Sequence, residues 1–290
     1  MGAERFIRTT CYKMINHISA AFFFLTYAAP ILLAYRLASS GWRPSLTELV
    51  SLFVETFCII GGCMSVCLHR YCAHRAFKVS RFVQAVIVVG GCFAYQGNPI
   101  WWASKHLRHH QHCDLPEDPH SWRQTSFLYA WIGWTMNPDE MSIDSKQVKF
   151  LSSHRELQVI GFLWWMWPLL VAVMVHVQWG VAPVVLYVTT PMLLARMVTL
   201  LFNVEYHPPH RSSRFDACRA LDIPRILGDC VGESCHADHH THPMRAKRPS
   251  GGFPHADLPY WLAIKPLLLV GLAWSPADNF EAPLQHTRMD

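Results

Sequence analysis

Residues 157–195 contain no Asp, Glu, Lys or Arg, and this feature limits the fold more than any other. A helix needs about 20 mostly apolar residues to cross a bilayer, so the stretch is long enough for two crossings. It is interrupted at Gln178-Trp179-Gly180, with Pro183 just beyond, and Gly and Pro commonly mark turns. We therefore predict a tight hairpin of two spanning helices, the second of which continues to about residue 202.

Two further stretches have the length and apolar character of spanning helices. Residues 18–35 carry no charge, and residues 49–68 carry only Glu55. Only 16% of all residues are charged, where a soluble domain usually has about 25%. We predict four spanning helices in two pairs, at about residues 18–38, 49–68, 157–177 and 182–202.

Residues 82–102 are apolar enough to be a fifth span, but the basic residues argue against it. With four spans, 22 of the 25 Lys and Arg lie on the side of the N-terminus, and only Arg36 and Arg43 flank the opposite loop. Basic residues gather on the cytoplasmic side of membrane proteins, so both termini should be cytoplasmic. We expect residues 82–102 and 260–274 to lie at the membrane interface, the latter because Lys265-Pro266 interrupts it.

The 18 histidines gather in three clusters. Two clusters share the spacing H-x-x-H-H, and residues i, i+3 and i+4 of a helix face one way. With four spans all three clusters lie at the cytoplasmic side, and Asn203-Val-Glu-Tyr-His207 ends the last span at the same depth. Imidazole binds Fe, Zn, Cu and Ni, and this many imidazoles exceed what one ion can hold, so we predict two metal ions. The clusters are His69 with His74, His106 with His109 and His110, and His236 with His239 and His240.

The ten cysteines predict no disulfide. The chain has no Cys-x-x-Cys, and Cys58, Cys63, Cys67 and Cys92 lie in apolar segments, where Cys behaves as a small hydrophobic residue. This usage indicates a reducing, cytoplasm-facing setting. A net charge of +5 without a basic run also excludes a nucleic-acid-binding protein.

The clusters resemble the histidine boxes of the membrane-bound fatty acyl desaturases of the stearoyl-CoA (delta-9) type. The resemblance covers about residues 15–275, and Asn203-x-x-x-His207 separates the chain from alkane hydroxylases and sterol oxidases. Further matching pieces are His74-Arg-Ala-Phe-Lys78, Asp118-Pro-His120 and Gly232-Glu233. The resemblance implies an all-α integral membrane protein, in which residues 1–290 form a single desaturase domain. Its four transmembrane helices would carry a cytoplasmic helical cap holding a di-metal site.

The resemblance also implies a cofactor, a ligand set and a reaction. Two Fe²⁺ ions, with O2 as co-substrate, would serve to insert a double bond into a carrier-linked acyl chain. Asn203 would approach one metal through a water molecule, and which His binds which iron is left open. The implied ligands are His69, His74, His106, His109, His110, His207, His236, His239 and His240.

Four carboxylates are candidates for orienting the ligand imidazoles by hydrogen bonds, although each is equally explained as a solvated loop charge. They are Asp114, Asp118, Glu233 and Asp238.

Two pairs of residues inside the predicted spans bear on the substrate and on the packing. Phe53 and Phe57 lie on the helix that leads to His69, so they would shorten an acyl tunnel and favour a short or medium chain, unless they face lipid or core. Glu55 and Arg196 lie at comparable depth on opposite-running helices. Because intramembrane charges are usually paired or functional, we predict a buried ion pair.

The acyl carrier and the electron donor are external to the chain. Ser104-Lys105 stands where CoA-using relatives tend to have Arg-Asp, so acyl carrier protein is an alternative to CoA. Arg245, Lys247 and Arg248 form a basic patch for solvent, lipid headgroups or an acidic carrier. No flavin, haem or iron–sulfur motif is visible, so ferredoxin, or cytochrome b5 with its reductase, would supply electrons.

Three alternatives remain open from the sequence. Similar di-iron sites act as acetylenases, which convert an alkene to an alkyne, or as hydroxylases on the same acyl substrates. A metal transporter or sensor is the non-enzymatic alternative, but a transporter should carry ligands at mid-membrane, whereas these gather at one end. The short chain without an ER-retrieval tail favours a bacterial inner membrane over the ER.

Overall fold

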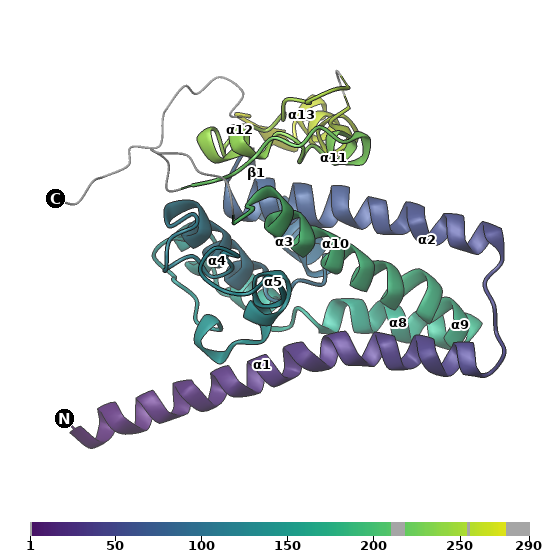
Figure 1. Ribbon diagram of the computed structural model, residues 1–290, viewed down its shortest axis with the longest axis horizontal. Coiled ribbons are helices and arrows are strands. Elements are labelled where there is room, and N and C mark those ends of the chain that lie inside the picture. The colour runs from purple at the N-terminus through teal and green to yellow at the C-terminus, as the bar shows by residue number, and fades with distance from the viewer. Residues whose placement is uncertain (1, 210–217, 254–255, 277–290) are drawn as a thin grey trace.

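The computed structural model describes residues 2–209, 218–253 and 256–276 and is mainly helical (Figure 1). Three of its helices are long and apolar enough to cross a membrane, at Lys13–Ser39, Leu46–Ala73 and Val181–Tyr206. A fourth span is possible if α7 (Arg155–Phe162) and α8 (Met166–Trp179), which meet at 54°, cross together. These segments coincide with the four predicted spans.

The three long helices lie side by side and are built from six regular segments, of which those within one helix follow one another end to end (Figure 1). The segments are α1 (Gly2–Ser39), α2 (Leu46–Cys58), the π-helix η1 (Ile59–Ala73), α9 (Val181–Val184), the π-helical turn η4 (Val185–Thr189) and α10 (Thr190–Tyr206). Ser45 caps α2, because its side chain accepts from the Glu48 backbone N–H while the Glu48 carboxylate accepts from the Ser45 N–H. At the predicted hairpin, Gly180 separates α8 from α9 with a φ of +84°, a value that favours glycine.

The π-helix η1 explains the spacing of the first histidine cluster. A π-helix joins residue i to residue i+5, and the His74 backbone N–H donates to the His69 carbonyl at 3.2 Å. Residues five apart therefore stack on one side of this helix. His69 and His74 reach the same locus for this reason.

Residues 82–102 do not form one continuous helix. The helix α3 (Arg81–Cys92) is about 18 Å long, whereas a bilayer core is about 30 Å thick. The chain then turns through Tyr95 and Gly97, both with positive φ, and a Cβ at Gly97 would lie 2.6 Å from the Phe23 ring. After this turn α4 (Pro99–Gln111) starts afresh, and the position of this segment at the membrane interface stays a prediction.

The elements outside the spans, including α3 and α4, pack mainly against η1, α10 and α1, and together with the ends of η1 and α10 we call them the cap (Figure 1). Arg70 in η1 anchors the cap by a buried ion pair with Asp257, with N–O distances of 2.7 and 2.9 Å. Strands β1 (Lys78–Val79) and β2 (Ala273–Trp274) pair antiparallel, with Lys78 opposite Trp274. The other cap helices are α5 (Phe127–Trp131), η2 (Gly133–Met136), η3 (Pro138–Glu140), α6 (Lys149–Ser152), α11 (Ile226–Val231), α12 (His236–Thr241), η5 (Tyr260–Ile264) and α13 (Lys265–Leu269).

The predicted ion pair between Glu55 and Arg196 is not formed. The fully buried Arg196 donates to the Thr26 hydroxyl at 2.8 Å, and its guanidinium carbon lies 3.5 Å from the Tyr27 ring centroid. Glu55 is half-buried on α2, and no ion pair of the described residues includes it. The face of an aromatic ring attracts a guanidinium group. The partner of Arg196 is therefore an aromatic residue of α1 and not the expected carboxylate.

Candidate metal centre

All nine predicted histidines converge in the cap, where they form two groups. The five-imidazole group contains His69, His74, His106, His110 and His239. The four-imidazole group contains His109, His207, His236 and His240. Within each group, the candidate ligand atoms all lie within 4.8 Å of one another.

Each H-x-x-H-H cluster is divided between the two groups in the same way. On α4, His106 and His110 belong to the five-imidazole group, and His109 belongs to the four-imidazole group. On α12, His236 and His240 belong to the four-imidazole group, and His239 belongs to the five-imidazole group. At about 100° per residue, i and i+4 differ by about 40°, while i+3 lies about 60° to the opposite side of i. The spacing thus aims two imidazoles at one point and the third at a neighbouring point, so the prediction that all three face one way is wrong in this respect.

The nitrogen atoms of these groups fit metal ions and do not fit hydrogen bonds alone. Nε2–Nε2 distances are 2.8 Å for His69–His239 and His74–His106, and 3.1 Å for His207–His236. A neutral imidazole Nε2 carries either one proton or one lone pair, so it can take part in one such hydrogen bond, yet the Nε2 atoms of His106 and His239 each lie within 3.1 Å of two other Nε2 atoms. Nitrogen ligands of one transition-metal ion lie about 3 Å apart, given metal–nitrogen bonds of about 2.0–2.1 Å.

His109 gives the same indication by itself. It is 1% exposed, and its Nε2 has no hydrogen-bond partner among the residues that the structure describes. A buried nitrogen without a partner is costly unless something binds it. The donor set of nine imidazoles therefore fits two iron ions.

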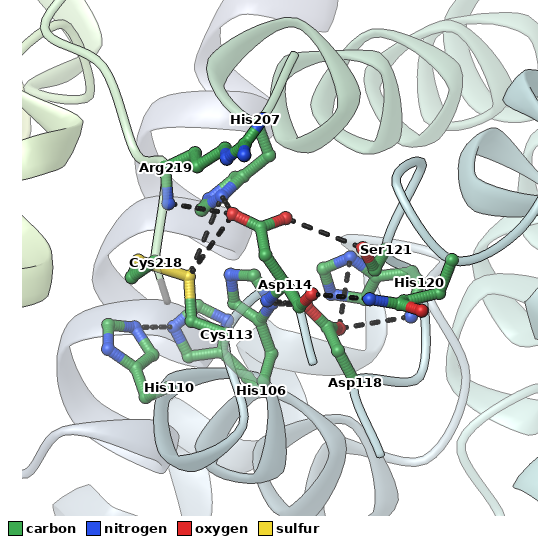
Figure 2. A network of polar contacts seen from close by, with 12 residues as sticks. His106, His110, Cys113, Asp114, Asp118, His120, Ser121, His207, Cys218 and Arg219 are labelled. Carbon is green, nitrogen blue, oxygen red and sulfur yellow. Dashed lines mark hydrogen bonds and ion pairs between the residues drawn. A yellow bond between two sulfur atoms is a disulfide. The ribbon is translucent and has the colours of Figure 1, made fainter. Parts of the chain in front are cut away.

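Three of the four candidate carboxylates bond to ligand imidazoles. Asp118 accepts from His109 Nδ1 at 2.9 Å, and Asp114 lies 3.3 Å from His207 Nδ1 (Figure 2). Glu233 accepts from His69 Nδ1 at 3.0 Å. Such contacts fix the tautomer that leaves Nε2 free for a metal.

The fourth candidate, Asp238, does not contact a ligand imidazole. It pairs with Arg245 at 2.8 Å and lies 3.2 Å from His242. Because it follows His236 by two residues on α12, its side chain leaves the helix on another side. Sequence reasoning instead assigned Arg248 to a basic patch and missed that it is buried against His239 Nδ1.

The electrostatics of the cap favour neutral imidazoles. Burial lowers the pKa of His106, His110 and His240 well below the ordinary value, and neighbouring imidazoles lower it further. Burial alone would raise the pKa of Glu233, but the interaction with His69, which donates a hydrogen bond to it, and the charges of Arg248 and Arg70 lower it to about 2. Carboxylates are thus ionised and most ligands uncharged near neutral pH, the states that metal binding requires.

The cysteines differ from the prediction, since Cys113 and Cys218 form a disulfide (Figure 2). Their Cα atoms are 4.9 Å apart, although 105 residues separate them in sequence. The sulfur of Cys113 lies 3.7 Å from His207 Nδ1, and that of Cys218 lies 3.4 Å from His240 Nδ1. No local spacing motif predicts this pair, because only the tertiary fold brings the two cysteines together.

A small cavity of about 30 Å³ touches both groups of imidazoles. His69 and His106 of the five-imidazole group and His236 of the four-imidazole group line it, and Asn203 faces it from α10. The volume accommodates a water-sized molecule.

A larger apolar groove of about 320 Å³ lies beside this cavity, between α2, α10 and α11. Phe53 and Phe57 both line the groove, together with Leu194 and Val231. Phe202 lines the groove and the cavity alike, so its ring stands between the two spaces.

Most of the predicted carrier patch is engaged within the protein. Arg248 is 3% exposed behind His239, so it is not a surface residue. Arg245 bonds to Asp238, and Lys247 lies over the Trp261 ring. The buried Lys105 likewise pairs with Glu140 at 2.7 Å, so it faces the interior and not a carrier.

Known proteins similar to this chain are desaturases or related enzymes. The sn-2 palmitoyl-lipid 9-desaturase of Nostoc sp. (strain 36) is 30% identical over 73% of this chain and 76% of its own length. The palmitoyl-monogalactosyldiacylglycerol delta-7 desaturase of Arabidopsis thaliana is 25% identical over 74% of this chain. The hex-5-enoyl-[acyl-carrier protein] acetylenase of Moorena producens (strain JHB) is 41% identical over 28% of this chain. The match spans 58% of the Arabidopsis protein and 25% of the acetylenase.

The family description "Fatty acid desaturase" matches residues 46–269, more than three quarters of the sequence. The matched region contains all nine histidines and both candidate cavities. The chain therefore belongs to the fatty acid desaturase family, whose members are oxidoreductases of membrane lipid metabolism.

Proposed function

We propose that this protein is an O2-dependent di-iron desaturase that inserts a double bond into a carrier-linked acyl chain. Its single membrane-bound domain would hold one iron in the five-imidazole group and one in the four-imidazole group, with Asn203 near the latter through a water. Two bound irons supply the activation of O2 that oxidation of an unactivated chain requires. Glu233, Asp118 and Asp114 orient the imidazoles through their Nδ1 atoms.

The observation that carries the proposal is the position of the small cavity. Imidazoles of both groups border it, and beyond Phe202 begins the apolar groove. A desaturase needs this arrangement, because one C–H bond must reach the two metals while the rest of the chain stays out of water.

We infer that the acyl chain lies along α2 and α10 in the groove. Phe53, which is 56% exposed, and Phe57 line the groove on α2, and Phe202 would have to turn for a chain to enter the cavity. Three aromatic rings along this path favour short or medium chains, because each removes volume from it.

Further proposals concern the partners and the location. The burial of Lys105 and Arg248 removes two cations that a CoA phosphate or an acidic carrier protein would contact, so the case for a chain carried on acyl carrier protein rests on Ser104-Lys105 standing where CoA-using relatives tend to have Arg-Asp. Electrons would come from ferredoxin, or from cytochrome b5 with its reductase. With four spans both termini would be cytoplasmic, and a bacterial inner membrane is the expected location.

An acetylenase is the second candidate, because the 41% identical relative carries that name. The two activities share one site and differ in whether the bound chain already has a double bond. Mass spectrometry of the products tests both. Iron-loaded protein with O2, a reducing system and acyl chains of several lengths, on CoA and on carrier protein, should give a loss of two hydrogens from a saturated chain.

Loss of two hydrogens from alkenyl chains only would identify an acetylenase, and a gain of one oxygen would identify a hydroxylase. If no chain changes while two irons are bound, the proposed function is wrong and metal transport or sensing becomes the better explanation.

A further inference from the structure

The cysteine pair lies directly against the metal centre. The disulfide joins the loop after α4 to the segment before α11, and each sulfur contacts the Nδ1 side of one imidazole of the four-imidazole group (Figure 2). For His240, Cys218 is the polar neighbour of Nδ1, where other ligands have a carboxylate. The pair therefore occupies a position that elsewhere in the centre serves metal binding.

The surroundings argue that the pair changes its redox state. The cap is predicted to face the cytoplasm, where disulfides are usually transient and catalytic or redox-sensing. Cys113 is only 4% exposed, so the metal centre is a nearer source of oxidant than bulk solvent. The Cα separation of 4.9 Å lies within the range of ordinary disulfides, so the bond needs no backbone movement to form.

We propose that Cys113 and Cys218 are a reversible, peroxide-responsive dithiol of this centre. The proposal rests on the proposed function for the source of the oxidant, which is hydrogen peroxide released when O2 gains two electrons and two protons without an acyl chain in place. One thiol attacks peroxide and becomes a sulfenic acid with loss of water. The second thiol displaces a second water and forms the disulfide, and an external dithiol later restores both thiols by exchange.

Peroxide is thereby consumed before it oxidises the ligands. Two thiols reduce one peroxide to two waters, so electrons and atoms balance. The modified sulfurs stand beside His207 and His240, which are the imidazoles most in need of protection if peroxide leaves on this side.

The test uses the full-length, iron-loaded protein after reduction with an external dithiol. One sample receives a small excess of hydrogen peroxide, and another receives O2 and an electron donor without any acyl chain. Mass spectrometry of alkylated peptides then reports the Cys113–Cys218 bond. Cys230, a half-buried free thiol on α11, is the matched control in the same molecule. We expect the bond to form in both samples while Cys230 stays alkylatable, and excess dithiol to reverse it.

Three results would overturn the proposal. The bond could persist in excess dithiol, which would make it a structural link. It could fail to form with peroxide although Cys230 is oxidised. The reduced protein could hold one additional zinc ion that the Cys113→Ser/Cys218→Ser variant lacks, which would make Cys113, Cys218, His207 and His240 a metal site.

Iron retention provides a readout independent of activity. After peroxide treatment and dithiol reduction, the wild type and Cys230→Ser should keep their iron, while Cys218→Ser should lose iron faster. Equal retention would contradict the protective role. If the sample without added peroxide takes up no O2, only the proposed function fails. The sample with added peroxide still tests the cysteine pair, because it does not depend on O2 activation by the protein.

Discussion

Replacing Asp118 by Asn tests how the protein holds the iron in the four-imidazole group. The Asp118 side chain is buried, and one oxygen accepts from His109 Nδ1 at 2.9 Å and from the Asp114 backbone N–H at 2.9 Å. The other oxygen accepts from the His120 N–H at 3.1 Å. An amide is nearly isosteric but has only one acceptor atom, so its NH2 group must face an N–H donor on one side.

The structure sets the size of the effect. One charge-assisted hydrogen bond is lost and one buried donor is left unpaired, which costs about 1.5–3 kcal/mol. Loss of such partners usually weakens metal binding about 10–100-fold. We therefore expect Asp118→Asn to bind one iron as the wild type does and the second about 10–100-fold more weakly.

Anaerobic titration of the metal-free protein with Fe²⁺ against a competing chelator measures both affinities. Asp238→Asn is the matched control, since it removes the same charge from a residue whose ion-pair partners in the described part of the chain are Arg245 and His242. The reasoning is refuted if Asp118→Asn binds both irons normally, or if Asp238→Asn weakens binding as much.

Three further predictions follow from buried or gating side chains. The pKa of Glu233 lies near 2 when folded, so its stabilisation of the metal-free protein, on the order of 3 kcal/mol, should be present above about pH 4.5 and lost as the pH falls towards 2. Unfolding of Glu233→Gln followed against pH should lack this dependence. Phe202→Ala should shift the preferred chain length upward in product analysis, whereas Phe162→Ala, on an exposed face of α7, should not. Arg196→Gln should lower stability by about 2 kcal/mol in thermal unfolding, because ring contacts are lost, and Glu55→Gln should change it by less than about 0.5 kcal/mol. Equal effects of the last two variants would contradict the ring-stacked environment of Arg196.

The sequence predicted the nine histidines that converge and the helices that carry most of them. The H-x-x-H-H spacing is a property of a single helix, and charge-free stretches of sufficient length predict spans without tertiary information. The same helical periodicity also explains why each cluster divides between two groups. His106 and His110 project from α4 in nearly the same direction, and His109 projects in a different one. The hairpin at Gly180 was likewise predictable, since the break lies within a few residues.

Only the tertiary structure decided which distant groups face one another. Cys113 and Cys218 are 105 residues apart, and Arg248 reaches His239 from a segment with no regular element. Arg196 contacts an aromatic ring of α1 and not Glu55, because its neighbours depend on how the helices pack and not on its depth in the membrane. Periodicity fixes the direction of a side chain on its own helix. The contact that it makes depends on how separate elements pack, and no local pattern records that.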